Sequence, residues 1–241
     1  MITPVKAFKI TDNQSLALIA LLGFIAFGGT LKMGFLWDDH EMIEKNPFIK
    51  SVSVQNVARA FQGDVFDGKG DAYFRPVQTL VNMADYQVWG LKSFGYHLTN
   101  LLIHIGNAIL LFLLLKLLYK KPELPFFAAA LFVVHPIIVE QLLIIAGRAE
   151  LLTTLFMLAS IYWAFSKDSR KNWAAVGFFF MSCLSKESGI VTPALIYLIG
   201  FLYPKFRLPW KRYFPYGIVI VLYLLLRSNA VGSSQLIPPL G

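Results

Sequence analysis

The stretch YHLTNLLIHIGNAILLFLLLKLLY, residues 96–119, decides the fold class of this chain. It is apolar along most of its length, and as a helix it is long enough to cross the roughly 30 Å hydrocarbon core of a bilayer. Strands of membrane barrels alternate apolar and polar residues, which this run does not do. In lipid the backbone polar groups of a segment must be satisfied internally. The run therefore predicts a membrane-spanning α-helix.

The composition of the whole chain agrees with this prediction. Of 241 residues, 56% are hydrophobic and only 15% are charged, whereas soluble domains carry about 25% charged residues. So few charges cannot cover the surface of a water-soluble globule of this size. We therefore predict an all-α polytopic membrane protein in which residues 1–241 form a single transmembrane domain.

Further apolar runs predict about seven spans with a cytoplasmic N-terminus. They cover residues 16–37, 96–119, 125–134, 149–165, 173–184, 190–203 and 214–226, and a polar tail follows at 227–241. Residues 137–146 are also apolar and are expected to bend back or to lie at the interface. Several runs are shorter than the roughly 20 residues of a perpendicular span. The first run lacks a small-residue cleavage site, so we expect it to be retained.

The basic residues predict the orientation. They fall in four short segments: Lys6 and Lys9; Lys120 and Lys121; Lys167, Arg170 and Lys171; and Lys205, Arg207, Lys211 and Arg212. Seven spans place all four segments on the cytoplasmic side, as the excess of Lys and Arg in cytoplasmic loops requires. The formal net charge of +8 is therefore interpreted as a topology signal, and no nucleic-acid partner is expected.

Residues 38–94 form a long non-cytoplasmic loop with its own predicted elements. Asn46 and Pro47 indicate a turn, and residues 54–61 have the spacing of an amphipathic helix that lies flat on the membrane. Residues 64–71 are rich in Gly and Asp and predict a mobile loop. A helix is expected to begin at Pro76 and to end at Gly90.

Ionisable and polar side chains gather on the predicted non-cytoplasmic side. They are Asp38, Asp39, His40, Glu41, Arg75, Tyr96, His97, His135, Glu140, Arg148, Glu150, Lys186 and Glu187. Taken singly, Arg148 and Glu150 could be a helix-end pair, and Lys186 and Glu187 could be a tight polar turn. Charges at membrane depth are costly and usually face a cavity or a partner. Together, the residues predict a site that binds an anionic lipid headgroup and supplies a general base.

The adjacent carboxylates Asp38 and Asp39 leave three interpretations open. Two neighbouring carboxylates can raise one pKa, which suits a general base. They could instead hold a hard divalent cation such as Mg or Mn, or they could form a solvated acidic loop end. His104, with Asn100 and Asn107 at helical spacing from it, is expected to form interhelical hydrogen bonds.

Cysteine usage adds one constraint. Cys183 is the single cysteine of the chain, which excludes an intramolecular disulfide and a multi-cysteine metal site. It lies in an apolar run, so we expect a buried packing role.

Six short motifs occur in a fixed order along residues 35–203. They are Trp37-Asp38-Asp39-His40-Glu41, Asn46-Pro47, Phe74-Arg75-Pro76-Val77, Gly95-Tyr96-His97-Leu98-Thr99-Asn100 with its continuation to His104, Val134-His135-Pro136 with Glu140 and then Ala146-Gly147-Arg148-Ala149-Glu150, and Leu184-Ser185-Lys186-Glu187. The series resembles the membrane domain of the transmembrane-and-tetratricopeptide O-mannosyltransferases and their prokaryotic relatives, within the GT-C superfamily.

The resemblance implies a membrane glycosyltransferase of the prokaryotic plasma membrane or the endoplasmic reticulum. Such an enzyme moves a sugar from a polyprenyl-phosphate donor to a hydroxyl of a protein or glycan acceptor on the periplasmic or lumenal side. By this resemblance, Asp38 or Asp39 would deprotonate the acceptor. The lipid phosphate would meet Arg75, His97, Arg148 and Lys186, while Tyr96, His135, Glu140, Glu150 and Glu187 would complete the substrate-binding set.

The sequence departs from this family because no 34-residue self-similarity is present. The last spans of the family are also missing, so we expect a reduced or truncated form, with partner subunits in place of the missing part. The alternative function is a non-catalytic GT-C-like subunit that scaffolds or binds lipid in a larger complex. A transporter is disfavoured, because transporter sites lie near the bilayer midplane and this cluster lies at one face.

Overall fold

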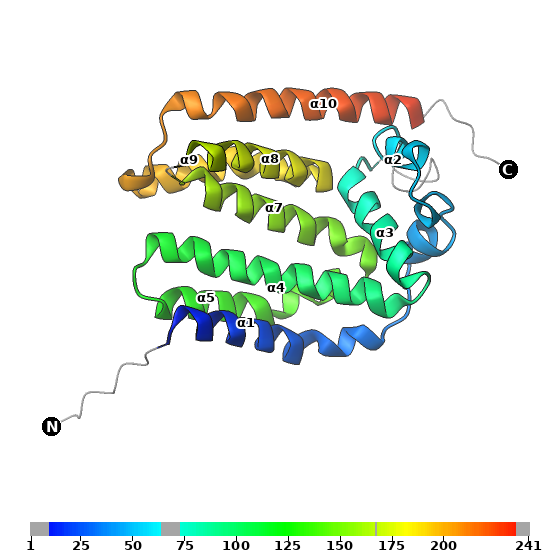
Figure 1. The fold of residues 1–241 in the computed structure, drawn as a ribbon, viewed down its shortest axis with the longest axis horizontal. Coiled ribbons are helices and arrows are strands. Elements are labelled where there is room, and N and C mark those ends of the chain that lie inside the picture. The colour runs from blue at the N-terminus through cyan, green and yellow to red at the C-terminus, as the bar shows by residue number, and fades with distance from the viewer. Residues whose placement is uncertain (1–9, 64–72, 167, 235–241) are drawn as a thin grey trace.

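A computed structural model describes residues 10–63, 73–166 and 168–234, and within these ranges every regular element is helical. The prediction of an all-α protein is confirmed. The predictions for residues 64–71 and for Lys6, Lys9 and Lys167 lie outside the described residues. Figure 1 shows the longer helices aligned along one axis of the molecule, with a group of short elements at one end.

Four helical segments of the described chain are long and apolar enough to cross a membrane: Asp12–Lys32, Ser93–Leu118, Ile145–Ala164 and Trp210–Val231. A bent pair, Glu123–Val134 and Pro136–Leu143, would be a fifth span, and Glu187–Leu202 is a shorter apolar helix. The structure thus gives four or five candidate spans, and the count of seven stays a prediction. Cys183 is fully buried, as expected from its apolar surroundings.

The central helix of the bundle is α4 (Ser93–Leu118), which contacts α1 (Asp12–Phe27), α5 (Glu123–Val134) and α7 (Arg148–Ala164). On its other side α7 packs against α8 (Ser169–Ser185), which in turn contacts α10 (Phe214–Ser234), while α9 (Thr192–Leu202) packs on α7. One apolar core lies between α1, α4 and α5, and a second lies between α7, α8, α9 and α10.

Polar side chains on α4 bind α4 to its neighbours. Asn100 donates to the Gln141 carbonyl at 3.2 Å, and Asn107 donates to the Leu151 carbonyl at 3.0 Å. The Nε2 atom of His104 lies 3.0 Å from the Val133 carbonyl. The prediction that these three residues form interhelical hydrogen bonds is confirmed.

The chain bends by 43° between α5 and the segment Pro136–Leu143, which contains the short helix α6 (Val139–Leu143). Pro136 cannot continue a helical hydrogen-bond ladder because it lacks an N–H. His135 Nδ1 accepts from the Ile137 N–H at 3.3 Å and begins a single turn of 3-10 helix (Pro136–Ile138). The chain therefore bends at the start of the apolar segment, and its expected return or placement at the interface stays a prediction.

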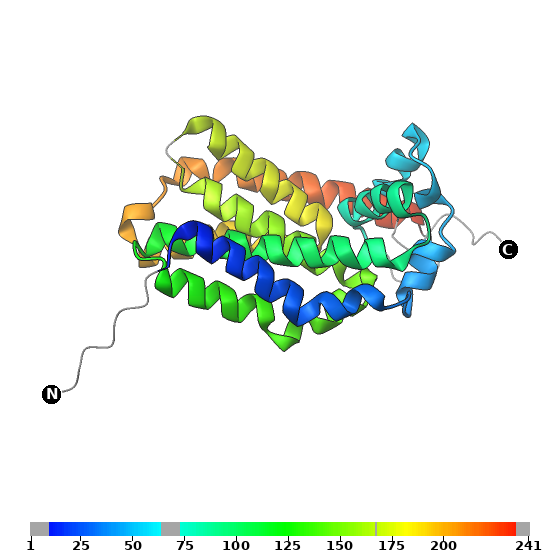
Figure 2. The same cartoon turned by 60° about the horizontal axis from the view of Figure 1, so that its bottom comes forward.

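The segment between α1 and α4 contains the predicted turn and the two predicted helices. Asn46 Oδ1 accepts from the Phe48 N–H at 2.9 Å, which closes the expected turn, and α2 (Val54–Ala60) is helical. The helix α3 (Pro76–Trp89) begins with Pro76 and is followed by Gly90 at a φ of 58°. Figure 2 shows this segment gathered at one end of the bundle.

Two predicted boundaries were wrong. The first helical segment ends at Lys32 and not at residue 37, because after Phe27 the chain enters a 3-10 stretch (Gly28–Lys32) that begins with two glycines. The polar tail predicted from residue 227 is helical up to Ser234 as part of α10. The Ser228 hydroxyl donates to the Leu225 carbonyl at 3.0 Å, so this polar side chain is satisfied inside the helix.

The two ends of the bundle differ in charge. The connection from α4 to α5, the start of α8 and the segment before α10 lie at one end, on the left in Figure 1. They carry the described basic residues Lys120, Lys121, Arg170, Lys171, Lys205, Arg207, Lys211 and Arg212. The segment between α1 and α4 lies at the other end. Which end faces the cytoplasm stays a prediction.

Candidate functional site

A cavity of about 290 Å³ opens at the end of the bundle opposite the basic connections. Segments far apart in sequence line it with Asp38, Arg75, Glu140, Glu150 and Lys186. The Lys186 ammonium forms an ion pair with the Glu150 carboxylate. The structure thus brings five of the predicted site residues around one space, with both signs of charge.

Two neighbouring residues fix the position of Arg75 at the cavity. Its guanidinium carbon lies 4.5 Å from the centroid of the Tyr73 ring, in a cation–π arrangement. Arg75 directly precedes Pro76, the first residue of α3, so the rigid start of that helix positions it. The Nε atom has no hydrogen-bond partner in the described protein.

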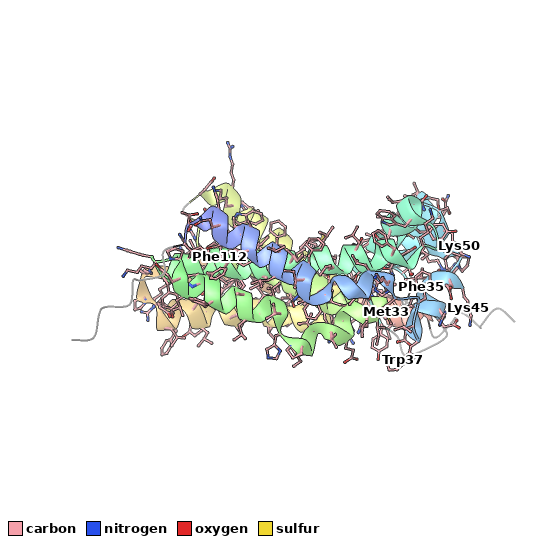
Figure 3. All side chains as sticks on the ribbon, turned by 90° about the horizontal axis from the view of Figure 1, so that it is seen from below. Met33, Phe35, Trp37, Lys45, Lys50 and Phe112 are labelled. Carbon is pink, nitrogen blue, oxygen red and sulfur yellow. The ribbon has the colours of Figure 1, made fainter. Side chains whose placement is uncertain are left out.

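Trp37 was missed by the sequence analysis as a member of this site. It lines the cavity beside Asp38, its side chain is 78% exposed, and its φ is 47°. It is the one non-glycine residue of the described ranges in the left-handed region, where a bulky side chain is strained. Figure 3 shows the indole standing out from the ribbon near Met33. No sequence signal marks such a backbone conformation.

The two adjacent aspartates have opposite environments. Asp38 is exposed and lines the cavity, whereas Asp39 is 0% exposed. Asp39 Oδ1 accepts from the Ala146 N–H at 2.9 Å, and Oδ2 accepts from the Leu36 N–H at 3.0 Å. The bond from Ala146 fastens the stretch that follows the first helical segment to the 3-10 turn Ile145–Gly147 before α7, and the bond from Leu36 is local. Burial raises the pKa of Asp39, although the backbone hydrogen bonds oppose that rise.

Removal of the Asp39 carboxylate is expected to destabilise the fold. In Asp39→Ala the partly buried N–H groups of Leu36 and Ala146 lose their acceptor, which costs up to about 1–3 kcal/mol each. We expect a loss of about 2–4 kcal/mol in the free energy of unfolding, on the same principle. Reversible unfolding in mixed detergent micelles measures it. Asp38→Ala, at the exposed neighbour, should change that free energy by no more than about 0.5 kcal/mol.

The stability that Asp39→Ala loses is expected to depend on pH. Because the folded-state pKa of Asp39 is raised above 3.8, the folded state favours the protonated carboxyl. The contribution of that carboxyl is therefore largest below pH 3.8 and decreases as the pH rises through the raised pKa. The difference in unfolding free energy between wild type and Asp39→Ala should shrink with rising pH across this window. A difference that grows instead would contradict the burial argument.

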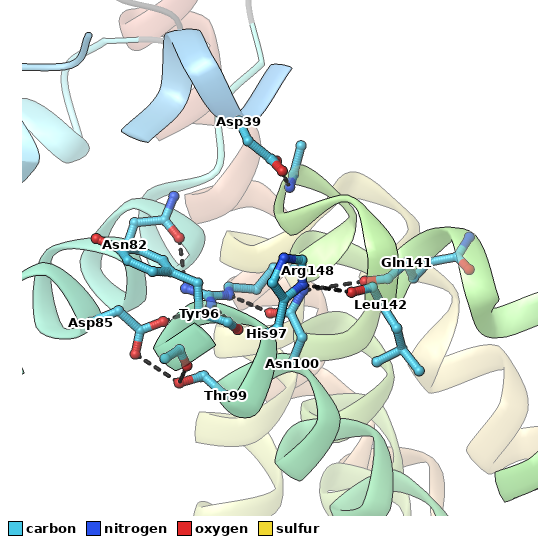
Figure 4. Close-up of polar contacts among 12 residues, drawn as sticks. Asp39, Asn82, Asp85, Tyr96, His97, Thr99, Asn100, Gln141, Leu142 and Arg148 are labelled. Carbon is cyan, nitrogen blue, oxygen red and sulfur yellow. Dashed lines mark hydrogen bonds and ion pairs between the residues drawn. The ribbon is translucent and has the colours of Figure 1, made fainter. Parts of the chain in front are cut away.

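Arg148 is not among the residues that line the cavity. Figure 4 shows its guanidinium surrounded by the polar groups of Asn82, Asp85 and Asn100. The Arg148 side chain is 0% exposed and donates to Asn100 Oδ1 and Asn82 Oδ1 at 2.7 Å each, and to the Tyr96 carbonyl at 2.9 Å. It also forms an ion pair of 2.6 Å with Asp85. This geometry leaves the guanidinium no face open to a lipid phosphate, so its role is the joining of α3, α4 and α7.

Asp85 and Asn82 are further residues that the sequence analysis missed. Together with Gln78 they form a buried polar stripe along α3 at positions i, i+4 and i+7. Gln78 donates to the Ala146 carbonyl at 2.9 Å, and Asp85 Oδ1 accepts from the Thr99 hydroxyl at 2.8 Å. These polar residues are spaced so that they lie on one face of a helix. That spacing could have predicted that α3 packs its polar face inward.

His97 and Tyr96 are also buried beside the cavity and not on its wall. The His97 ring lies between two carbonyl oxygens, with Nδ1 3.0 Å from Leu142 O and Nε2 3.2 Å from Gly34 O. The Tyr96 hydroxyl donates to the Gly90 carbonyl at 2.9 Å. Both residues therefore hold the segments that form the cavity.

The remaining predicted residues lie outside the cavity lining. His135 is exposed and caps the turn before α6, and Glu187 begins the 3-10 segment before α9. His40 pairs with Glu44, and Glu41 pairs with Lys45, one helical turn further along the chain.

The described residues do not form a metal centre. They contain no group of three or more His, Cys, Asp or Glu side chains placed to share an ion. Both carboxylate oxygens of Asp39 accept from backbone N–H groups, which leaves Asp38 alone in the acidic pair as a potential ligand. The Mg or Mn site stays a prediction, and no step of the proposed reaction uses a metal.

Comparison with known proteins agrees with the resemblance to O-mannosyltransferases. A protein O-mannosyl-transferase of Caenorhabditis elegans is 31% identical over 206 residues, which are 83% of this chain and 30% of that protein. This chain is a homologue of the protein O-mannosyl-transferases. Protein O-mannosyl-transferase Tmtc1 of Drosophila melanogaster is 27% identical over 81% of the chain, and TMTC2 of Homo sapiens is 28% identical over 72%.

The homology covers only part of these relatives. The chain spans about a quarter to a third of their length, namely 30%, 24% and 22% of the three proteins named above. No family model matches the chain, and no solved structure matches it. Together with the apolar helices, the homology makes this an integral membrane protein.

Proposed function

We propose that this chain transfers mannose from a polyprenyl-phosphate carrier to a hydroxyl group of a protein acceptor. The observation that carries the proposal is the cavity that places the Asp38 carboxylate in one space with the cations Arg75 and Lys186. A carboxylate can take the proton of the acceptor hydroxyl, and cations can stabilise the charge that develops on a leaving phosphate. The sugar and the acceptor class come from the homologues, which are named protein O-mannosyl-transferases.

In the proposed reaction Asp38 takes the proton of the acceptor hydroxyl. The freed oxygen forms a bond to the anomeric carbon of the sugar, while the bond from that carbon to the phosphate oxygen breaks. The carrier phosphate leaves with the electron pair, and negative charge develops on it. Arg75 and Lys186 stabilise that charge, which lowers the barrier because their positions are already set by the protein.

The neighbouring residues set the positions of these groups. Glu150 orients the Lys186 ammonium through their ion pair. Arg148 acts as a positioning residue, since it fixes the start of α7, from which Glu150 projects. Asp39, similarly, fastens the turn that presents Asp38. We assign the cavity to the lumenal or periplasmic side, because it lies opposite the basic end of the bundle.

Loss of the Lys186 charge tests the proposal. Purified chain in nanodiscs is supplied with polyprenyl-phosphate mannose and a Ser/Thr-containing peptide, and mass spectrometry follows the gain of one hexose. In Lys186→Gln a charged hydrogen bond worth about 1.5–3 kcal/mol is removed, so kcat/KM should fall roughly 10- to 100-fold.

The matched control is Lys45→Gln, at an exposed lysine that is ion-paired with Glu41 outside the cavity. It should retain wild-type turnover. If wild-type chain binds the donor in this assay but transfers no sugar to any peptide, a non-catalytic subunit replaces the enzyme as the function. An equal loss in the two variants would contradict the assignment of the phosphate to this cavity.

A further inference from the structure

A second cavity lies at the basic end of the bundle, far from the proposed catalytic space. Its volume is about 320 Å³, and it lies between the start of α8 and the start of α10. Its apolar wall includes Val176, Leu208 and Pro215, and Lys211 and Arg212 stand at its polar side. The mechanism proposed above uses none of these residues.

One side of this cavity is apolar and the other is basic, which suits an anionic amphiphile. Arg212 donates to Asn172 at 3.3 Å, which joins the segment before α10 to α8 beside the cavity. Trp173, also in the lining, is 69% exposed, and Trp side chains favour the headgroup level of a bilayer. Of the described residues that line the cavity, none carries a carboxylate. An anionic headgroup would therefore meet two cations and no opposing charge.

We propose that this cavity binds one anionic glycerophospholipid. The phosphate contacts Lys211 and Arg212, and the first part of an acyl chain lies on the apolar wall formed by Val176 and Pro215. A basic pocket between membrane helices is a recognised form of site for anionic headgroups. The bound lipid joins α8 to α10. The proposal does not depend on the proposed glycosyl transfer.

The test is a lipid titration of the purified full chain in detergent, followed by native mass spectrometry. Phosphatidylglycerol should bind with one-to-one stoichiometry, and phosphatidylcholine should bind at least about tenfold more weakly, since it carries no net charge. Glycerol phosphate, which has the charge but no acyl chain, should not compete at equal concentration. The same titration is repeated on two variants with an equal loss of charge.

The Lys211→Gln/Arg212→Gln variant should lose at least about tenfold in affinity for phosphatidylglycerol. The Arg170→Gln/Lys171→Gln variant, which removes two exposed cations at the same end but outside the cavity, should change less than about twofold, because only contacts inside the cavity are specific. Equal weakening of both variants would show diffuse surface attraction and would overturn the proposal.

A substitution of the apolar wall gives an independent check. Val176→Phe fills the cavity without a change of charge, so it should weaken phosphatidylglycerol binding while the melting temperature without lipid stays at the wild-type value. If phosphatidylglycerol binds this variant and wild type equally, the acyl chain does not occupy the cavity and the assignment fails. Should the variant not fold, Leu208→Ala is measured in its place. It removes part of the same apolar wall, so phosphatidylglycerol binding should weaken here too.

Discussion

Asp38→Asn is expected to lower the rate of mannosyl transfer about 10²- to 10⁴-fold, the contribution typical of a general base. The amide that replaces the carboxylate cannot take the proton of the acceptor hydroxyl. Because Asp38 is exposed at the cavity and is not among the buried polar residues, the fold should persist. The expected pattern is a large fall in kcat with an unchanged dissociation constant for the lipid donor, measured in the nanodisc assay.

Glu41→Gln is the matched control for this result. Glu41 lies three residues further along the chain, pairs with Lys45 and does not line the cavity. Its variant should keep wild-type kcat. If Asp38→Asn retained full activity while Asp39→Asn lost it, the proton acceptor would be the buried aspartate. The division of roles between the two aspartates would then be wrong.

Arg148→Met is expected to cost about 3–5 kcal/mol in the free energy of unfolding, the size typical of breaking a buried ion pair. Methionine fills much of the same volume, but it leaves Asp85 buried without its cation and leaves the acceptors Asn82 and Asn100 unsatisfied. Unfolding in mixed detergent micelles measures the loss. The double variant Arg148→Met/Asp85→Asn should regain part of it, because the uncompensated charge is then removed.

The exposed ion pair between Lys116 and Asp12 provides the comparison. Lys116→Met breaks a pair with the same N···O distance of 2.6 Å but with side chains that are 24% and 54% exposed, and exposed pairs contribute about 0–1 kcal/mol. If Arg148→Met kept wild-type stability and instead weakened binding of the lipid donor, Arg148 would contact the phosphate directly. The buried position described here would then need to open during the reaction.

The helical architecture and the position of most helices followed from the sequence. The run at residues 96–119 contains α4 almost completely, and Pro76 and Gly90 bound α3 as expected. These features are local: apolar length, the missing N–H of proline and the positive φ that glycine tolerates. The interhelical bonds of Asn100, His104 and Asn107 were also predictable, because a polar group on an apolar helix must find a partner there.

The sequence did not indicate which side chains line the cavity. The sequence put Asp38, Arg148 and Lys186 at one end of the bundle, but it could not separate a side chain on the wall of the cavity from one in the interior. Arg148 is buried because Asp85 and Asn82, more than sixty residues earlier in the chain, supply its partners. Such pairing depends on how α3 docks against α4 and α7, and no local pattern records it.

The sequence by itself determined that the chain is a helical membrane protein with its polar motifs at one end, since hydropathy and charge position are properties of the residues alone. Only the tertiary structure decided that Asp38 faces the cavity while Asp39 is tied to Ala146, and that Trp37 turns into the left-handed region between the first helix and this pair. Adjacent residues of one type acquire different roles when the backbone turns one side chain inward and the next outward.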